Sequence, residues 1–160
     1  MMFSSLSKAL LVSLLGVLVA TSAACGSNDT TTHASSFVGT WHPTSGTTTL
    51  TCAGTPSTSS VTDNLTWGAG VGADLVQTSG SCMLKANVTS STASALPSQT
   101  CTEAAGTATV VLAVAAYTFS LSADGLTATE SVSGSATVSQ GGLTETCTFS
   151  GLASYQKIAN

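Results

Sequence analysis

The stretch TATVVLAVAAYTFSL, residues 107–121, decides the fold class of this 160-residue chain. Its alanines favour a helix, because alanine has the highest helix propensity. Its β-branched and aromatic residues, such as Val110, Val114 and Phe119, favour a strand instead and dominate the stretch. The pair Asp124-Gly125 follows, and Asp-Gly supplies the positive φ angles of a tight hairpin turn. The stretch is therefore predicted to be a strand that reverses into a hairpin.

The rest of the chain after Phe37 also has a sequence pattern that is typical of β-strands. Apolar and polar residues alternate with a period of two, and Gly, Ser and Asn lie at the breaks. The expected strands cover residues 37–41, 47–52, 61–67, 73–77, 82–88, 92–96, 107–121, 126–138, 143–150 and 152–158. Short turns between them predict an all-β antiparallel meander that closes into a small barrel, since closure removes exposed edges. A two-layer β-sandwich would give nearly the same pattern and stays as the alternative.

Residues 1–24 are predicted to be a signal peptide that is removed. Lys8 is their one positive charge, the apolar block 9–20 follows, and small residues lead up to Cys25. The block is too short for a membrane-spanning helix, which needs about 20 apolar residues. An ordinary signal peptide cleaved near Ala24, with Cys25 left as a free thiol, is one interpretation of this segment.

The residues Ala23-Ala24-Cys25-Gly26 support a second interpretation, because they resemble the lipobox of bacterial lipoproteins. Ser22 stands where that family usually has an aliphatic residue. The resemblance implies that Cys25 becomes the lipidated N-terminus of the mature chain and anchors it to a membrane, at the bacterial outer membrane or in the periplasm. Residues 25–36 are then the lipidated cysteine and a flexible polar tether that includes His33, and residues 37–160 form one β domain.

The charge balance excludes nucleic acid as a partner. Of the three Lys and Arg residues, Lys8 lies in the signal peptide, which leaves only Lys85 and Lys157 against seven carboxylates. Nucleic-acid binding depends on several Lys or Arg contacts to phosphate. Solubility must come mainly from the hydroxyl groups of Ser and Thr.

Four cysteines follow Cys25, namely Cys52, Cys82, Cys101 and Cys147. An even number in an exported chain predicts two disulfides, for which three connectivities exist. A turn near residues 90–91 would place Cys82 opposite Cys101, which favours that bond and leaves Cys52 with Cys147. No C-x-x-C pair is present, so neither a metal site nor another cofactor is expected.

Three acids lie two residues away from apolar or cysteine residues on both sides in their expected strands: Asp63, Glu130 and Glu145. Side chains two residues apart point to the same face of a sheet, so these carboxylates are expected in the interior. Buried carboxylates need a partner, and the hypothesis is an interior polar pocket for a cation or a polar small molecule. The alternative is that strand ends or bulges put each acid in solvent, because a slip of one residue flips the face.

The chain is not predicted to be an enzyme. His33 and His42 are its only histidines, so a Ser-His-Asp triad would have to use His42, which lies beside Pro43 in an expected turn. No G-x-S-x-G nucleophile motif is present. Aromatic residues are 5% of the chain, too few for the sugar-binding cleft of a paired-carboxylate glycosidase.

Gly39-Thr40-Trp41 opens the β region and resembles the G-x-W start of the lipocalins. In that family the tryptophan plugs the base of an eight-stranded barrel that holds a small apolar ligand. The resemblance therefore implies the same for Trp41, although the arginine that packs on this residue in lipocalins has no counterpart in a chain without arginine.

Two functions remain open at this point. The first is a binding module with a ligand cavity of about 300 Å³ or more, for which Trp67, Tyr117 and Phe119 are the expected lining. The second is a structural or protein-interaction component of the envelope, without a ligand pocket, which would have a solid core and an unpaired strand edge.

Overall fold

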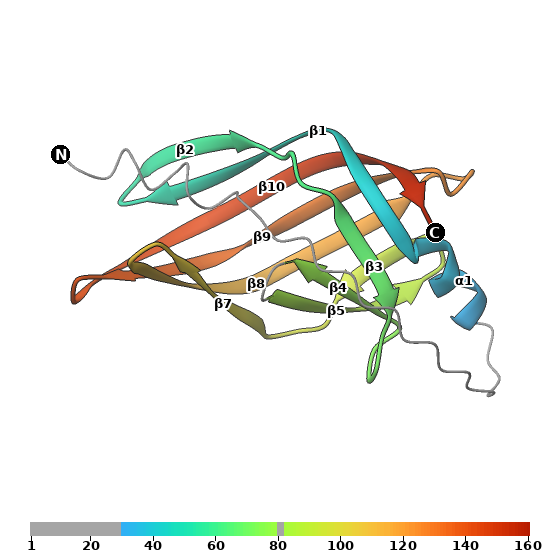
Figure 1. The fold of residues 1–160 in the computed structure, drawn as a ribbon, viewed down its shortest axis with the longest axis horizontal. Coiled ribbons are helices and arrows are strands. Elements are labelled where there is room, and N and C mark those ends of the chain that lie inside the picture. Colours follow the sequence, from blue (N-terminus) through green and yellow to red (C-terminus); the bar gives the residue numbers. More distant parts are fainter. Residues whose placement is uncertain (1–29, 80–81) are drawn as a thin grey trace.

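The computed structural model describes residues 30–79 and 82–160 (Figure 1). The elements are α1 (Thr30–Phe37), β1 (Gly39–Cys52), β2 (Thr55–Ser60), β3 (Leu65–Ala69), β4 (Leu75–Ser79), β5 (Cys82–Thr89), β6 (Thr92–Ala95), β7 (Gln99–Ala105), β8 (Ala108–Leu121), β9 (Thr127–Gln140) and β10 (Leu143–Ala159). Within this part of the chain no helix combines the length and the apolar character that crossing a membrane requires.

Eight antiparallel strands form a closed barrel in the order β1, β10, β9, β8, β6, β5, β4, β3 and back to β1. The pairing of β1 with β10 closes the ring. Two further strands lie on the same sheet: β2 pairs with the second half of β1, and β7 pairs with the first half of β8. The predicted all-β barrel is therefore confirmed, and the two-layer sandwich is not formed.

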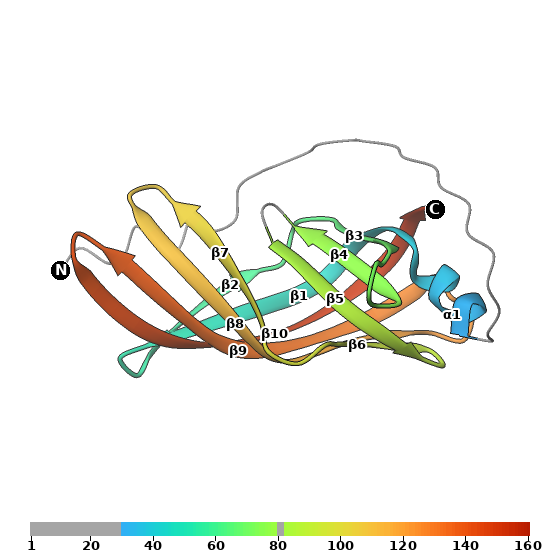
Figure 2. The same cartoon turned by 90° about the horizontal axis from the view of Figure 1, so that it is seen from below.

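Unequal strand lengths leave one side of the barrel open. β1, β8 and β9 have 14 residues each and β10 has 17, whereas β3 and β4 have five. At the end that carries α1 the ring is complete. At the other end only the four long strands continue, together with the two added strands β2 and β7. Figure 2 shows the long strands as a curved trough, with β3, β4 and β5 closing it over one part.

A bulge in β8 decides which of its side chains face the interior. Val110 is buried on the even-numbered face of this strand. The pairing with β9 shifts between Val114 and Ala116, which inserts one extra residue on β8. An extra residue moves the interior face to the other parity. Tyr117 and Phe119, both buried, therefore follow on the odd-numbered face.

The closed end of the barrel holds the main hydrophobic core. Its largest fully buried side chains are those of Phe37, Trp41, Trp67, Leu75 and Phe119. The rings of Trp41 and Phe119 meet edge to face with their centroids 5.2 Å apart, a favourable aromatic geometry. Trp41 Nε1 donates a hydrogen bond to the Phe37 carbonyl oxygen at 2.9 Å, which ties α1 to the base of the barrel.

The structure differs from the expected tether and first strand. Residues Thr30–Phe37 form helix α1, where a flexible linker was expected up to residue 36. Phe37 is the last residue of this helix and does not open a strand, since β1 begins only at Gly39. Its side chain is fully buried in the core. His33 is exposed on α1. Cys25 lies outside the described residues.

Two breaks that were expected between strands are absent, because one continuous strand runs through each position. The expected strands at 37–41 and 47–52 are both within β1, whose pairing with β10 shifts between Pro43 and Ser45. Such an irregularity accommodates a proline, which lacks the N–H that a regular ladder needs. In β10 the chain likewise runs through Gly151, where 143–150 and 152–158 were expected to separate.

Candidate functional site

A cavity of about 390 Å³, open to solvent on one side, lies on the inner face of the sheet, where the closed end of the barrel meets the open trough. Seventeen residues line it: Thr48, Leu50, Ser57, Ser59, Gln77, Cys82, Met83, Leu84, Gln99, Thr100, Cys101, Leu112, Val114, Tyr117, Glu130, Val132 and Phe149. They come from both the long strands and the short ones, so the cavity exists only because the sheet closes on itself.

Most of the lining is apolar, and strand register explains how it comes together. Leu50 of β1 lies opposite Phe149 of β10, and Leu112 of β8 lies opposite Cys101 of β7. Leu50, Leu112 and Phe149 are each only partly buried. They therefore present apolar surface that a ligand would bury.

Among the described residues that line the cavity, Glu130 is the one that carries a charged side chain. Glu130 lies on β9 between Ala128 and Val132, on the interior face of the strand. Its Oε2 accepts a hydrogen bond from the Tyr155 hydroxyl at 2.8 Å. Burial raises the pKa of Glu130, and the hydrogen bond from Tyr155 opposes this effect.

Two buried polar atoms, the Tyr117 hydroxyl and Trp67 Nε1, form no hydrogen bond of good geometry with the described residues. The Tyr117 hydroxyl is nevertheless near enough to the Glu130 carboxylate for each to shift the pKa of the other. The rings of Tyr117 and Trp67 lie edge to face with centroids 6.0 Å apart. Burial, and then the charge of Glu130, raise the pKa of Tyr117 well above its ordinary value. An unpaired buried polar group costs on the order of 1–3 kcal/mol.

Gln99 is a lining residue whose importance the sequence did not indicate. Its side-chain amide accepts from the Lys85 backbone N–H and donates to the Lys85 carbonyl oxygen, the second bond at 2.7 Å. A further bond of 2.9 Å reaches the Leu96 carbonyl oxygen. β5 and β7 do not pair as neighbouring strands among the described residues, and the Gln99 amide connects them instead. Gln99 therefore holds the cavity wall together and is not free for a ligand.

Of the three acids expected in the interior, only Glu130 lines the cavity. Asp63 is exposed in the connection between β2 and β3, because β3 begins only at Leu65 and no strand fixes the face of Asp63. Glu145 is half-buried at the open end of β10. Its carboxylate lies within 4.8 Å of the sulfurs of Cys52 and Cys147, but both sulfurs are in a disulfide and cannot bind a metal.

The other expected site residues fall partly in the core. Tyr117 lines the cavity as expected, whereas Trp67 and Phe119 pack in the closed end. His42 is exposed, and its Nδ1 lies 2.9 Å from Asn64 Oδ1, away from the cavity lining.

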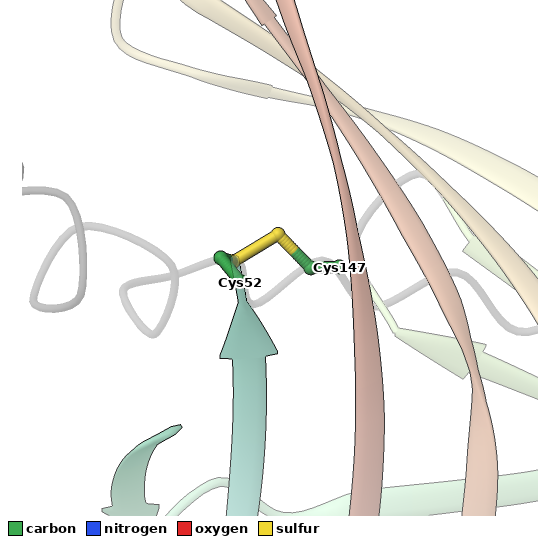
Figure 3. Close-up of a disulfide and its surroundings, with 2 residues drawn as sticks. All are labelled: Cys52 and Cys147. Carbon is green, nitrogen blue, oxygen red and sulfur yellow. A yellow bond between two sulfur atoms is a disulfide. The ribbon is translucent and has the colours of Figure 1, made fainter. Parts of the chain in front are cut away.

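The two disulfides are Cys52–Cys147 and Cys82–Cys101, the pairing that the sequence favoured. The first joins directly opposed residues of β1 and β10, the strands that close the ring (Figure 3). The second joins β5 to β7 in the cavity wall. Disulfides persist in oxidising environments, which agrees with an exported protein.

The partly buried carboxylate of Glu130 makes the stability of the protein depend on pH. Because burial raises the pKa of Glu130, the folded protein keeps this proton to a higher pH than the unfolded chain does. Between the two pKa values the unfolded chain releases the proton first, so the free energy of unfolding falls as the pH rises. Glutamine does not titrate, and its oxygen still accepts from Tyr155. We expect urea midpoints of the wild type to fall relative to Glu130→Gln from about pH 4 to pH 7.

The comparison isolates Glu130, because every other acid is present in both proteins. Asp124 is one of them; hydrogen bonds from Ser122 and from the Leu126 backbone lower its pKa. Parallel midpoint curves for the two proteins would contradict the expected cost of ionising Glu130.

Comparisons with protein families, with curated proteins and with solved structures found no match to this chain. Function must therefore be inferred from the cavity and the side chains around it.

Proposed function

We propose that this protein binds a small, mainly apolar ligand in its barrel cavity. The observation that supports the proposal is the half-open cavity of about 390 Å³ with a largely apolar lining. Ligand sites typically measure about 300–1,000 Å³ and combine apolar walls with a few polar groups. Glu130 and Tyr117 would be those polar groups.

The cellular location of the protein is part of this proposal. We infer an exported bacterial lipoprotein, held at an envelope membrane by a lipid on Cys25; the lipobox resemblance and the two disulfides support this location. Four residues, 26–29, separate Cys25 from Thr30 at the start of α1, and the five steps between these two residues reach at most about 18 Å. A lipid on Cys25 would therefore keep α1 and the closed end near the membrane, with the open trough pointing away.

Binding of the neutral fluorophore N-phenyl-1-naphthylamine tests the cavity. We expect saturable enhancement of its emission by the wild-type protein. Leu112→Trp adds a large ring inside the lining and should weaken binding by at least about tenfold, a loss of about 1.4 kcal/mol. Val111→Trp is the matched control, because Val111 is exposed on the outer face of the same strand.

Circular dichroism establishes that both variants remain folded. Binding that is absent in the wild type, or equal loss in both variants, would refute the cavity as the binding site.

A structural or protein-interaction role is the second candidate, and the edges of the open trough favour it. Among the described strands β2 pairs only with β1, and β7 pairs only with β8. Edge strands of this kind can accept a further strand from a partner. A wild-type protein that fails to bind the fluorophore would favour this role.

A further inference from the structure

The Glu130 carboxylate has no compensating cation among the described residues. Lys157 Nζ donates to the Ser36 carbonyl oxygen at 3.0 Å and lies 5.4 Å above the Trp41 ring, at the closed end. Lys85 is absent from the cavity lining, whereas Leu84, its neighbour on β5, contributes to it. The chain contains no arginine. A carboxylate in this position either takes up a proton or needs a cation from outside the protein.

We propose that the cavity takes an amphiphilic amine, with its protonated amino group at Glu130 and its apolar body against Leu50, Leu112 and Phe149. The inference rests on the proposed function, since it requires that the cavity binds a ligand.

The polar end of the cavity fits an ammonium group. An ammonium carries three donors and no acceptor, and an ionised carboxylate accepts about four hydrogen bonds. Tyr155 occupies only part of this capacity, at Oε2 of Glu130. The Tyr117 hydroxyl lies beside the same carboxylate, and its oxygen keeps a lone pair that could accept a bond from the ammonium. One bound group would therefore contact both the carboxylate and the hydroxyl.

The groups around Glu130 favour a cation and disfavour an anion. Tyr117 faces it from β8 and Tyr155 from β10, and the pKa values of both phenols are raised, first by burial and then by the charge of Glu130. Asp63, in the β2–β3 connection, adds a smaller effect on Tyr155. The two phenols therefore stay neutral, Glu130 supplies the negative charge, and no basic side chain is among the described residues that line the cavity.

The rest of the lining excludes a purely polar amine as the best ligand. Leu50, Leu112 and Phe149 are partly buried and would lose further apolar surface to water only if the ligand covers them. Burial of apolar area contributes roughly 25 cal/mol per Å². The chemical class is therefore a primary amine with an apolar chain or ring.

Displacement of N-phenyl-1-naphthylamine by three probes with the same chain tests this class on the full-length protein. The probes are octylamine, octanol and octanoate at neutral pH, where the amine is protonated like a lysine side chain. We expect octylamine to displace the fluorophore at a concentration at least about tenfold below the concentration of octanol that is needed. A tenfold ratio corresponds to about 1.4 kcal/mol of binding free energy. Octanoate should be the weakest of the three, because Glu130 repels it.

Glu130→Gln should lower the preference for octylamine over octanol to about one, with each displacement concentration corrected for the fluorophore affinity measured on the same variant. Glu145→Gln is the matched control, because it removes the same charge from the open end of the barrel, where Glu145 is half-buried and outside the lining. It should keep the preference. Tyr117→Phe is a second variant, which removes one oxygen and should reduce the preference several-fold.

The outcomes separate this inference from the proposed function. If the fluorophore and octanol bind but octylamine has no advantage, the amine class is wrong and the apolar binding site stands. A preference that survives Glu130→Gln, or that Glu145→Gln removes equally, also overturns the assignment to Glu130. Absence of fluorophore binding to the wild type refutes the proposed function itself.

Discussion

Replacing Cys52 and Cys147 together by alanine is expected to lower the free energy of unfolding by about 4.7 kcal/mol. Their disulfide spans 95 residues of the chain, and it joins the two strands whose pairing closes the barrel. A cross-link over so long a loop removes much conformational entropy from the unfolded chain. Urea unfolding followed by tryptophan fluorescence measures the loss, since Trp41 and Trp67 are buried at the closed end.

The Cys82/Cys101 double alanine variant is the control for this prediction. That disulfide spans only 19 residues, so its removal should cost about 3 kcal/mol. A larger loss from the short loop than from the long one would contradict the chain-entropy explanation. It would indicate instead that the Cys82–Cys101 bond, which lines the cavity, mainly holds β5 and β7 together in the folded state.

The sequence placed strands along all four long elements, because their side chains alternate between core and solvent, although it divided β1 and β10 into two strands each. In β10, for example, Cys147, Ala153 and Tyr155 are buried and Leu152 is exposed. The bulge in β8 was not predictable in the same way. Residues 112–116 are apolar on both parities, so no change in the pattern marks the position where the interior face flips.

β2 and β7 were missed for a different reason. β2 consists of hydroxyl residues and one proline, and each of the two strands pairs with a single neighbour. Edge strands of this kind are held mainly by backbone hydrogen bonds, which leave no trace in side-chain polarity. Helix α1 is similarly inconspicuous, because its one fully buried large side chain is Phe37, its last residue.

The candidate site was predictable only in part. The parity of Glu130 placed it on the interior face, because β9 runs regularly on both sides of it. The same reasoning was wrong for Asp63, which lies where no strand forms. The role of Gln99 depends on the interruption between β6 and β7, and this gap is a property of the closed barrel that local sequence does not encode.

Trp41→Ala is expected to destabilise the protein by about 4 kcal/mol, in the range measured for buried aromatic residues that are truncated to alanine. Trp41 is fully buried, packs edge to face on Phe119 and carries Lys157 above its ring. The loss therefore combines a cavity at the base of the barrel with release of α1, whose Phe37 carbonyl oxygen accepts from Trp41 Nε1.

Phenylalanine substitutions separate the hydrogen bond from the packing. Trp41→Phe keeps a ring but leaves the Phe37 carbonyl oxygen without its donor, an additional cost of about 1–3 kcal/mol. Trp67 is the matched control, because it is equally buried but its Nε1 has no partner among the described residues. Trp67→Phe removes an unsatisfied donor and should cost less than Trp41→Phe in urea unfolding. Equal losses would show that Trp41 acts through its volume alone and that its bond to Phe37 does not hold α1 against the barrel.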